Sequence, residues 1–234
     1  MAVDRRLERL CERVTLVGGV GTPKRGELCI MSFVALLAGE RHTDHPASAS
    51  PLIRNLAIPV NDAMPRDVRQ RLKPFAARIV GTDDGCDRER VEVLRQILAR
   101  EILPRILRDW GTGQIAERRR LPLELLFAAV GRDIVARTAL LLHQLEGGTP
   151  PGHEARIGSA MGEHLALCMR EATTQERRAW YWNEATNLLD RLCDIGAEPR
   201  RRAIRSDQID QAEERLGRPW LRGMRRLMLH SAGA

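Results

Sequence analysis

Apolar residues recur at helical spacing along most of the chain. Between Asp87 and Trp110 they follow a period of about 3.6 residues, which is typical of an amphipathic helix. The segment from Leu28 to Ala38 is apolar on every side except at Ser32, and such a helix is normally buried in the centre of a bundle. Aromatic residues make up only 3% of the chain, and alternating runs of β-branched residues are nearly absent. We therefore predict an all-α fold, a multi-helix bundle of roughly eight to ten helices.

The chain has 234 residues, which is enough for one large domain or two small ones. We expect a single helical domain over residues 1–234, with 1–111 and 112–234 as the alternative subdivision.

The glycine-rich stretch from Gly18 to Lys24 superficially resembles a phosphate-binding loop. However, Pro23 removes an amide, and Arg25 stands where that loop needs a hydroxyl. A flexible connector is the prediction for this stretch.

The start of the chain and its cysteines indicate where the protein resides. Charged residues from Asp4 to Arg6 open an amphipathic segment, so we expect no secretory signal. The 5 cysteines are widely spaced and contain no C-x-x-C pair. No apolar run approaches the ~20 residues that a membrane span needs. We expect a cytoplasmic protein with reduced thiols, no membrane association and no cofactor.

The densest group of chemically useful side chains lies just after the apolar segment. It consists of Glu40, His42, Asp44 and His45, and Glu27 stands near the start of the preceding segment. These residues could act as acids or bases, and His42, Asp44 and His45 could also ligate a metal. The alternative is a surface turn with a helix cap, in which Glu27 complements a helix dipole.

Asp62 is a further candidate. It follows Asn61 and precedes a Met-Pro pair, which is a good turn signal. It is therefore either a turn residue or a polar group that faces the loop cluster.

This part of the sequence also resembles a known family. The matching positions are Glu27-x-Cys29-x-Met31, Ala38-Gly39-Glu40-x-His42-x-Asp44-x-Pro46, Pro51, Asn61-Asp62, Arg71-Leu72-x-Pro74 and Gly81-Thr82. They cover about a quarter of the chain and resemble a segment of a family of bacterial and phage helical proteins that has no assigned activity. Relatives carry cysteines after the Asp-x-Pro element, whereas this chain has Ala47 to Ser50 there. The resemblance implies a site in this segment, but neither a function nor cysteine chemistry.

The basic residues are concentrated near the C-terminus. The formal net charge is +7, and all basic residues except Lys24 and Lys73 are arginines, which suit carboxylates and phosphates. The residues that we predict to form a binding surface are Arg200, Arg201, Arg202, Arg205, Trp220, Arg222, Arg225 and Arg226. The alternative is a solvated amphipathic helix.

These observations favour a helical adaptor or regulatory module over an enzyme. Its arginine-rich surface would bind a protein partner or nucleic acid through phosphate contacts. The alternative function is an enzyme with an acid–base or metal site at Glu27, His42, Asp44 and His45. The apolar helices could also complete a homodimer interface.

Overall fold

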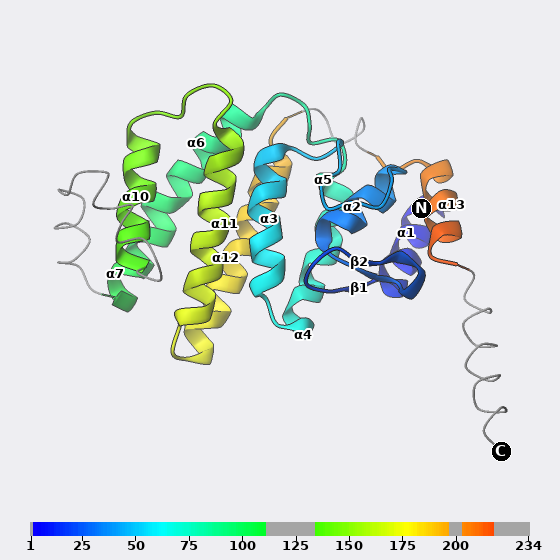
Figure 1. Cartoon of the computed structure of the whole chain (residues 1–234), viewed down its shortest axis with the longest axis horizontal. Coiled ribbons are helices and arrows are strands. Elements are labelled where there is room, and N and C mark those ends of the chain that lie inside the picture. The colour runs from blue at the N-terminus through cyan, green and yellow to red at the C-terminus, as the bar shows by residue number, and fades with distance from the viewer. Residues whose placement is uncertain (1, 111–133, 197–202, 218–234) are drawn as a thin grey trace, which may run out of the picture.

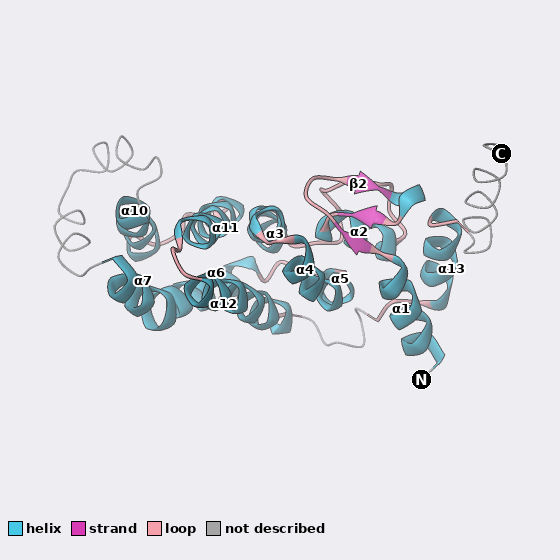
Figure 2. Cartoon of the chain, turned by 90° about the horizontal axis from the view of Figure 1, so that it is seen from below, coloured by secondary structure: helices cyan, strands magenta, loops and turns pink. Residues whose placement is uncertain are grey.

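The structure, a computed structural model, describes residues 2–110, 134–196 and 203–217. Within these ranges the chain is mostly helical, which confirms the predicted fold class, and it contains one small sheet. The helices form two stacked rows (Figures 1 and 2). One row comprises α10 (Ile134–Glu146), α11 (Glu154–Glu171), α3 (Pro51–Ala63) and α2 (Ile30–Ala38) beside the sheet. The other comprises α7 (Leu103–Trp110), α6 (Asp87–Ile97), α12 (Gln175–Asp194), α5 (Lys73–Ile79) and α1 (Ala2–Arg13).

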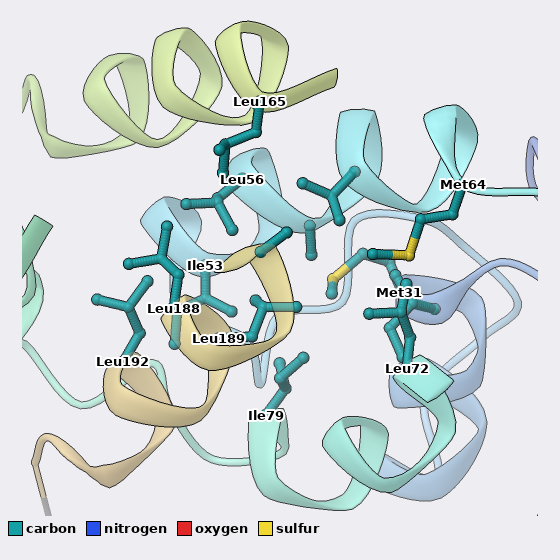
Figure 3. Packing of buried hydrophobic residues seen from close by; sticks show 14 of the residues in the cluster. Met31, Ile53, Leu56, Met64, Leu72, Ile79, Leu165, Leu188, Leu189 and Leu192 are labelled. Carbon is teal, nitrogen blue, oxygen red and sulfur yellow. The ribbon is translucent and has the colours of Figure 1, made fainter. Parts of the chain in front are cut away.

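Side chains from both rows meet in one hydrophobic core. Figure 3 shows Leu56 of α3 facing Leu165 of α11, with Leu189 of α12 and Ile79 of α5 on the other side. Each of these side chains is fully buried, which stabilises the fold by about 1.5–3 kcal/mol per residue. The same cluster includes residues from α1 to the end of the described chain. None of the described helices has the length and apolarity needed to cross a membrane.

Helix α2 is the buried segment that the sequence predicts. Residues Ile30 to Leu37 are all buried, and the helix ends at Gly39, whose φ is +77°. Glycine adopts this left-handed conformation without steric cost, so the chain can leave the helix sharply. Cys29 caps the other end through its sulfur, which accepts from the Ser32 amide at 3.2 Å.

Residues 15–28 form a three-stranded sheet, so the prediction of a flexible connector is wrong. β1 (Thr15–Leu16) pairs parallel with β3 (Glu27–Leu28), and β2 (Gly21–Thr22) pairs antiparallel with β3. A 3₁₀ turn, η1 (Pro23–Arg25), joins β2 to β3. At Gly21, φ is +80° and an added Cβ would lie 2.3 Å from the Glu27 carbonyl oxygen, so only glycine fits there. Strands of two residues are too short to give an alternating pattern in the sequence.

Helices α3 and α11 pack unusually closely because α11 carries glycines at the contact. A Cβ added at Gly158 would lie 2.3 Å from the carbonyl oxygen of Leu52. One added at Gly162 would lie 2.5 Å from the carbonyl oxygen of Leu56. Residues four apart lie on one helix face, so these two glycines form a flat strip against the backbone of α3.

The long helix predicted from Asp87 to Trp110 is present, but it is not regular throughout. A π-helical segment, η3 (Leu98–Ile102), separates α6 from α7. Pro104 is the second residue of α7; it lacks a backbone N–H, and its ring crowds the preceding turn. Pro104 in the sequence predicts that this helix is bent or split nearby, and the π-helical segment divides it there. The apolar stretch from Pro122 to Leu145 also predicts a helix. Only its part in α10 lies within the described residues.

Between α3 and α5 the chain forms α4 (Arg66–Arg69) and a 3₁₀ turn, η2 (Gln70–Leu72). Helix α13 (Ser206–Arg215) returns to the N-terminal end of the molecule and lies beside α1 (Figure 1). The Gln208 side-chain amide donates to the carbonyl of Ala38 at 3.2 Å, and Arg6 of α1 donates to Glu213 at 3.1 Å. These contacts position α13 over the C-terminal end of α2.

Candidate functional site

A cavity of about 690 Å³ lies between α2, η1 and α13. Ser32, Leu36 and Glu40 follow one another at intervals of four residues and form one wall. The opposite side is formed by Thr22 to Lys24 and by Glu214 and Arg215, and the loop residues Arg41 and His42 complete the lining. Sites for small molecules usually have volumes of about 300–1,000 Å³, so this cavity is large enough to hold one.

Basic side chains reach the cavity from three different segments. Lys24 comes from η1, Arg41 from the loop after α2, and Arg215 from α13. Arg215 is held in place because it donates to the backbone oxygens of Gly39, at 3.0 Å, and of Glu40. Most of the cavity wall is hydrocarbon, to which Leu36 contributes. The arrangement combines positive charge with an apolar surface.

Ser32 is the polar group at the α2 wall of the cavity. It is only 1% exposed, and its hydroxyl accepts from the Cys29 thiol at 3.3 Å. The Cys29 sulfur also accepts from the Ser32 amide, so Ser32 and Cys29 form one hydrogen-bonded pair at the buried side of the cavity. Burial raises the pKa of the Cys29 thiol, which therefore stays protonated and acts as a helix cap rather than a nucleophile.

Glu40 borders the cavity but has a clear structural task. One of its carboxylate oxygens accepts from the Ala47 amide at 2.7 Å, and the other accepts from the Ser48 amide at 2.9 Å. Both bonds close the loop that follows α2. The loop brings His42 to the edge of the same cavity.

The other loop residues lie away from this cavity. Asp44 pairs with His45 through Oδ1 and Nδ1 at 2.7 Å, and the His45 side chain is 62% exposed. The structure thus brings Glu40 and His42 to one cavity and leaves Asp44 and His45 as a surface pair. In residues 2–110, 134–196 and 203–217, no group of three or more His, Cys, Asp or Glu side chains is arranged to hold a metal ion.

Glu27 and Asp62 belong to the small sheet and its support. Glu27 lies on β3, so the interpretation of it as a first-turn helix residue is wrong. Asp62 lies in the last turn of α3, which continues through Pro59, so it is not a turn residue. Its carboxylate accepts from the Gly19 amide at 3.1 Å, and the neighbouring Asn61 donates to the carbonyl of Val17 at 2.9 Å. Both side chains therefore hold the loop between β1 and β2.

Most of the predicted arginine-rich surface lies outside the described residues. This applies to Arg200, Arg201, Arg202, Trp220, Arg222, Arg225 and Arg226. Arg205 is described; it precedes α13 and forms an ion pair with Asp207 at 3.0 Å. The surface as a whole stays a prediction.

Sequence reasoning missed most residues of the cavity wall. Ser32 gave a signal, because it is the one polar interruption of the apolar segment. Arg215 gave no such signal in the sequence, since its position depends on α13 packing against α2, which is far away along the chain.

Comparisons with protein-family models, curated proteins and solved structures give no match. The site is therefore interpreted from its own geometry.

Proposed function

We propose that the chain is a helical binding module that holds a small amphipathic anion in the cavity between α2, η1 and α13. One observation carries the proposal: Lys24, Arg41 and Arg215 converge on a cavity whose wall is mostly hydrocarbon. An anionic head group would lie among these cations, and an apolar portion would cover Leu36.

The acidic residues of the lining do not cancel this preference. Both carboxylate oxygens of Glu40 accept backbone N–H bonds, which disperse its negative charge. Glu214 is exposed, so water screens its charge. The cavity lining thus carries three positive charges against two negative charges whose electrostatic effect is reduced.

This proposal keeps the class of function that the basic composition favours, namely a binding module. Recognition of a protein partner or nucleic acid by the C-terminal arginines stays a separate prediction. The enzyme alternative also stays a prediction, with Glu40 and His42 as its members at the cavity. A homodimer interface formed by the apolar helices likewise stays a prediction.

A panel of ligands tests the proposal. We expect octyl phosphate or octanoate to bind with a stoichiometry of one and to raise the melting temperature of the protein. Octanol lacks the charge and inorganic phosphate lacks the apolar portion, so each should bind at least about tenfold more weakly. Equal affinity for octanol and the two octyl anions, or no binding of any of them, would refute the proposal.

A further inference from the structure

The cavity between α2, η1 and α13 is lined by two parts of the chain that meet only in the folded protein. Most of the lining belongs to residues 22–42, whereas Glu214 and Arg215 belong to α13 and its last turn. A ligand in the cavity therefore contacts both parts at once. It meets the complete set of lining groups only while α13 is docked on α2.

Helix α13 is held in place by a small apolar face and by exposed polar contacts. Ile209, Ala212 and Leu216 form the apolar face and are fully buried. Arg6 of α1 donates to Asp210 at 2.5 Å, and the Asp210 side chain is 65% exposed. Water and salt weaken an ion pair in such a position, so the contact adds little to the docking of α13.

The helix also depends on docking for its own stability. It has 10 residues, fewer than the ~12–15 that an isolated helix needs to persist in water. Helices α3 and α11, in contrast, lie in the middle of the molecule and pack closely at Gly158 and Gly162 (Figure 1). Segments with little buried apolar surface open locally before the core does. We therefore expect α13 to open while α3 and α11 stay folded.

We propose that α13 is a latch that the ligand closes, so that an occupied cavity favours the docked helix and an empty cavity favours its release. The inference rests on the function proposed above, because it concerns the same cavity. A ligand shifts an equilibrium only through contacts that differ between the two states. Here the differing contacts are those to Arg215, which is fixed beside the cavity by the carbonyl of Gly39 only when α13 is docked. Linkage is reciprocal, so the docked helix must also raise the affinity for the ligand.

Release of the latch changes the surface that the protein presents. The apolar face of Ile209, Ala212 and Leu216 would become accessible, together with the part of α2 that Gln208 now covers through its bond to the Ala38 carbonyl. The protein would thus present an apolar surface without the ligand and hide it when the ligand is bound. Such a change converts binding of a small molecule into a signal that a protein partner can detect.

Hydrogen exchange of the full chain, with and without octyl phosphate, tests the latch. The dissociation constant is first measured by calorimetry. Without the ligand, exchange in residues 206–215 should be faster than exchange in α3, because α13 opens alone. A free ligand concentration of about nine times the dissociation constant should slow exchange in residues 206–215 about tenfold, since only the docked state binds.

Two matched variants of α1 change the docking without changing the cavity. Arg6→Gln removes the ion pair to α13, and Arg6 does not border the cavity. We expect exchange in residues 206–215 to be severalfold faster in this variant, and octyl phosphate should slow it by the same factor as in the wild type. Arg9→Gln is the control, because Arg9 is exposed on the same helix and also does not border the cavity. Its exchange rates should equal those of the wild type.

The possible failures are distinguishable. If octyl phosphate binds and exchange in residues 206–215 stays the same, the latch is refuted and the proposed function stands. The latch is also refuted if these residues exchange as slowly as α3 without the ligand, because α13 would then open only with the whole fold. Absence of octyl phosphate binding would refute the proposed function and the latch with it.

Discussion

Arg215 of α13 donates to the carbonyl oxygen of Gly39 at 3.0 Å, where α2 ends. The same guanidinium also donates to the carbonyl of Glu40. A residue near the end of the described chain thus completes a cavity whose other wall is formed by residues 32–40. The cavity consequently exists only when α13 is docked on α2.

Arg215→Ala should therefore loosen α13 and weaken ligand binding together. The two carbonyl acceptors lose a charged donor at a partly exposed site, so we expect a loss of about 1 kcal/mol in the free energy of unfolding. Hydrogen exchange in residues 206–215 should speed up, while exchange in α3 stays unchanged. Arg205→Ala is the control, because among the described residues the Arg205 side chain forms an exposed ion pair with Asp207 alone, which belongs to the same turn. Equal exchange rates in both variants would contradict the docking role.

Arg90 is fully buried and connects three parts of the fold. Its terminal nitrogens donate to both carboxylate oxygens of Asp84, at 2.8 and 2.9 Å, and its Nε donates to the carbonyl of Leu192 at 3.2 Å. Arg90→Met removes one partner of a buried ion pair, which should cost about 3–5 kcal/mol in the free energy of unfolding. Urea denaturation measures this loss. The exposed neighbour Arg88, replaced by Met, should change stability by less than about 0.5 kcal/mol.

Gly158→Ala should destabilise the contact between α3 and α11. The new methyl group would approach the Leu52 carbonyl to 2.3 Å, so the helices must separate, and overpacking of this kind costs about 1–3 kcal/mol. In an exposed helix the same change would be stabilising, which makes the sign of the effect diagnostic. Ser159→Ala, one residue along and on another face, is the control. A stabilised Gly158→Ala variant, measured by thermal unfolding, would show that the helices are not this close.

His164 should make the protein less stable in acid. Burial, together with the positive charge of Arg137, lowers the pKa of His164 to about 3, whereas the unfolded chain has the ordinary value of about 6.5. At pH values between these two pKa values, the imidazole of His164 is protonated in the unfolded chain and neutral in the folded protein. The free energy of unfolding therefore falls as pH drops below 6.5, by up to about 1.4 kcal/mol per pH unit from this group. His164→Gln should remove this component, which is visible as a shallower pH dependence in urea titrations from pH 7 to pH 4. Identical slopes in the two proteins would contradict a buried neutral histidine.

The helical fold could be predicted because it rests on local pattern. Burial of α2 follows from its apolar sequence, and the interruption before Pro104 follows from the missing N–H of that residue. The N-terminus of α12 was also predictable, although the cap is Thr174, which accepts from the Arg177 amide at 3.2 Å. The sequence Thr173-Thr174-Gln175-Glu176 predicts a capping box, but with Thr174 as the cap Glu176 is one position too early to complete it.

The sheet and the site could not be predicted in the same way. In the sequence Arg90 looks like any surface arginine, and only the fold places Asp84 and Leu192 around it. Asn61 and Asp62 have the composition of a turn, yet they lie in a helix and hold a distant loop. Such roles depend on contacts between segments far apart in the chain, which leave no periodic signal.

Titration of octyl phosphate into three proteins tests the central claim most directly. The wild type and Arg88→Ala should bind it with equal affinity, since Arg88 does not border the cavity. Arg41→Ala should bind it about five to ten times more weakly, because a basic group near the anionic head is lost, equivalent to about 1 kcal/mol. Its melting temperature without ligand should be unchanged, as Arg41 is exposed and forms no ion pair within residues 2–110, 134–196 and 203–217. Equal affinity in all three proteins would contradict an anion site in the cavity between α2, η1 and α13.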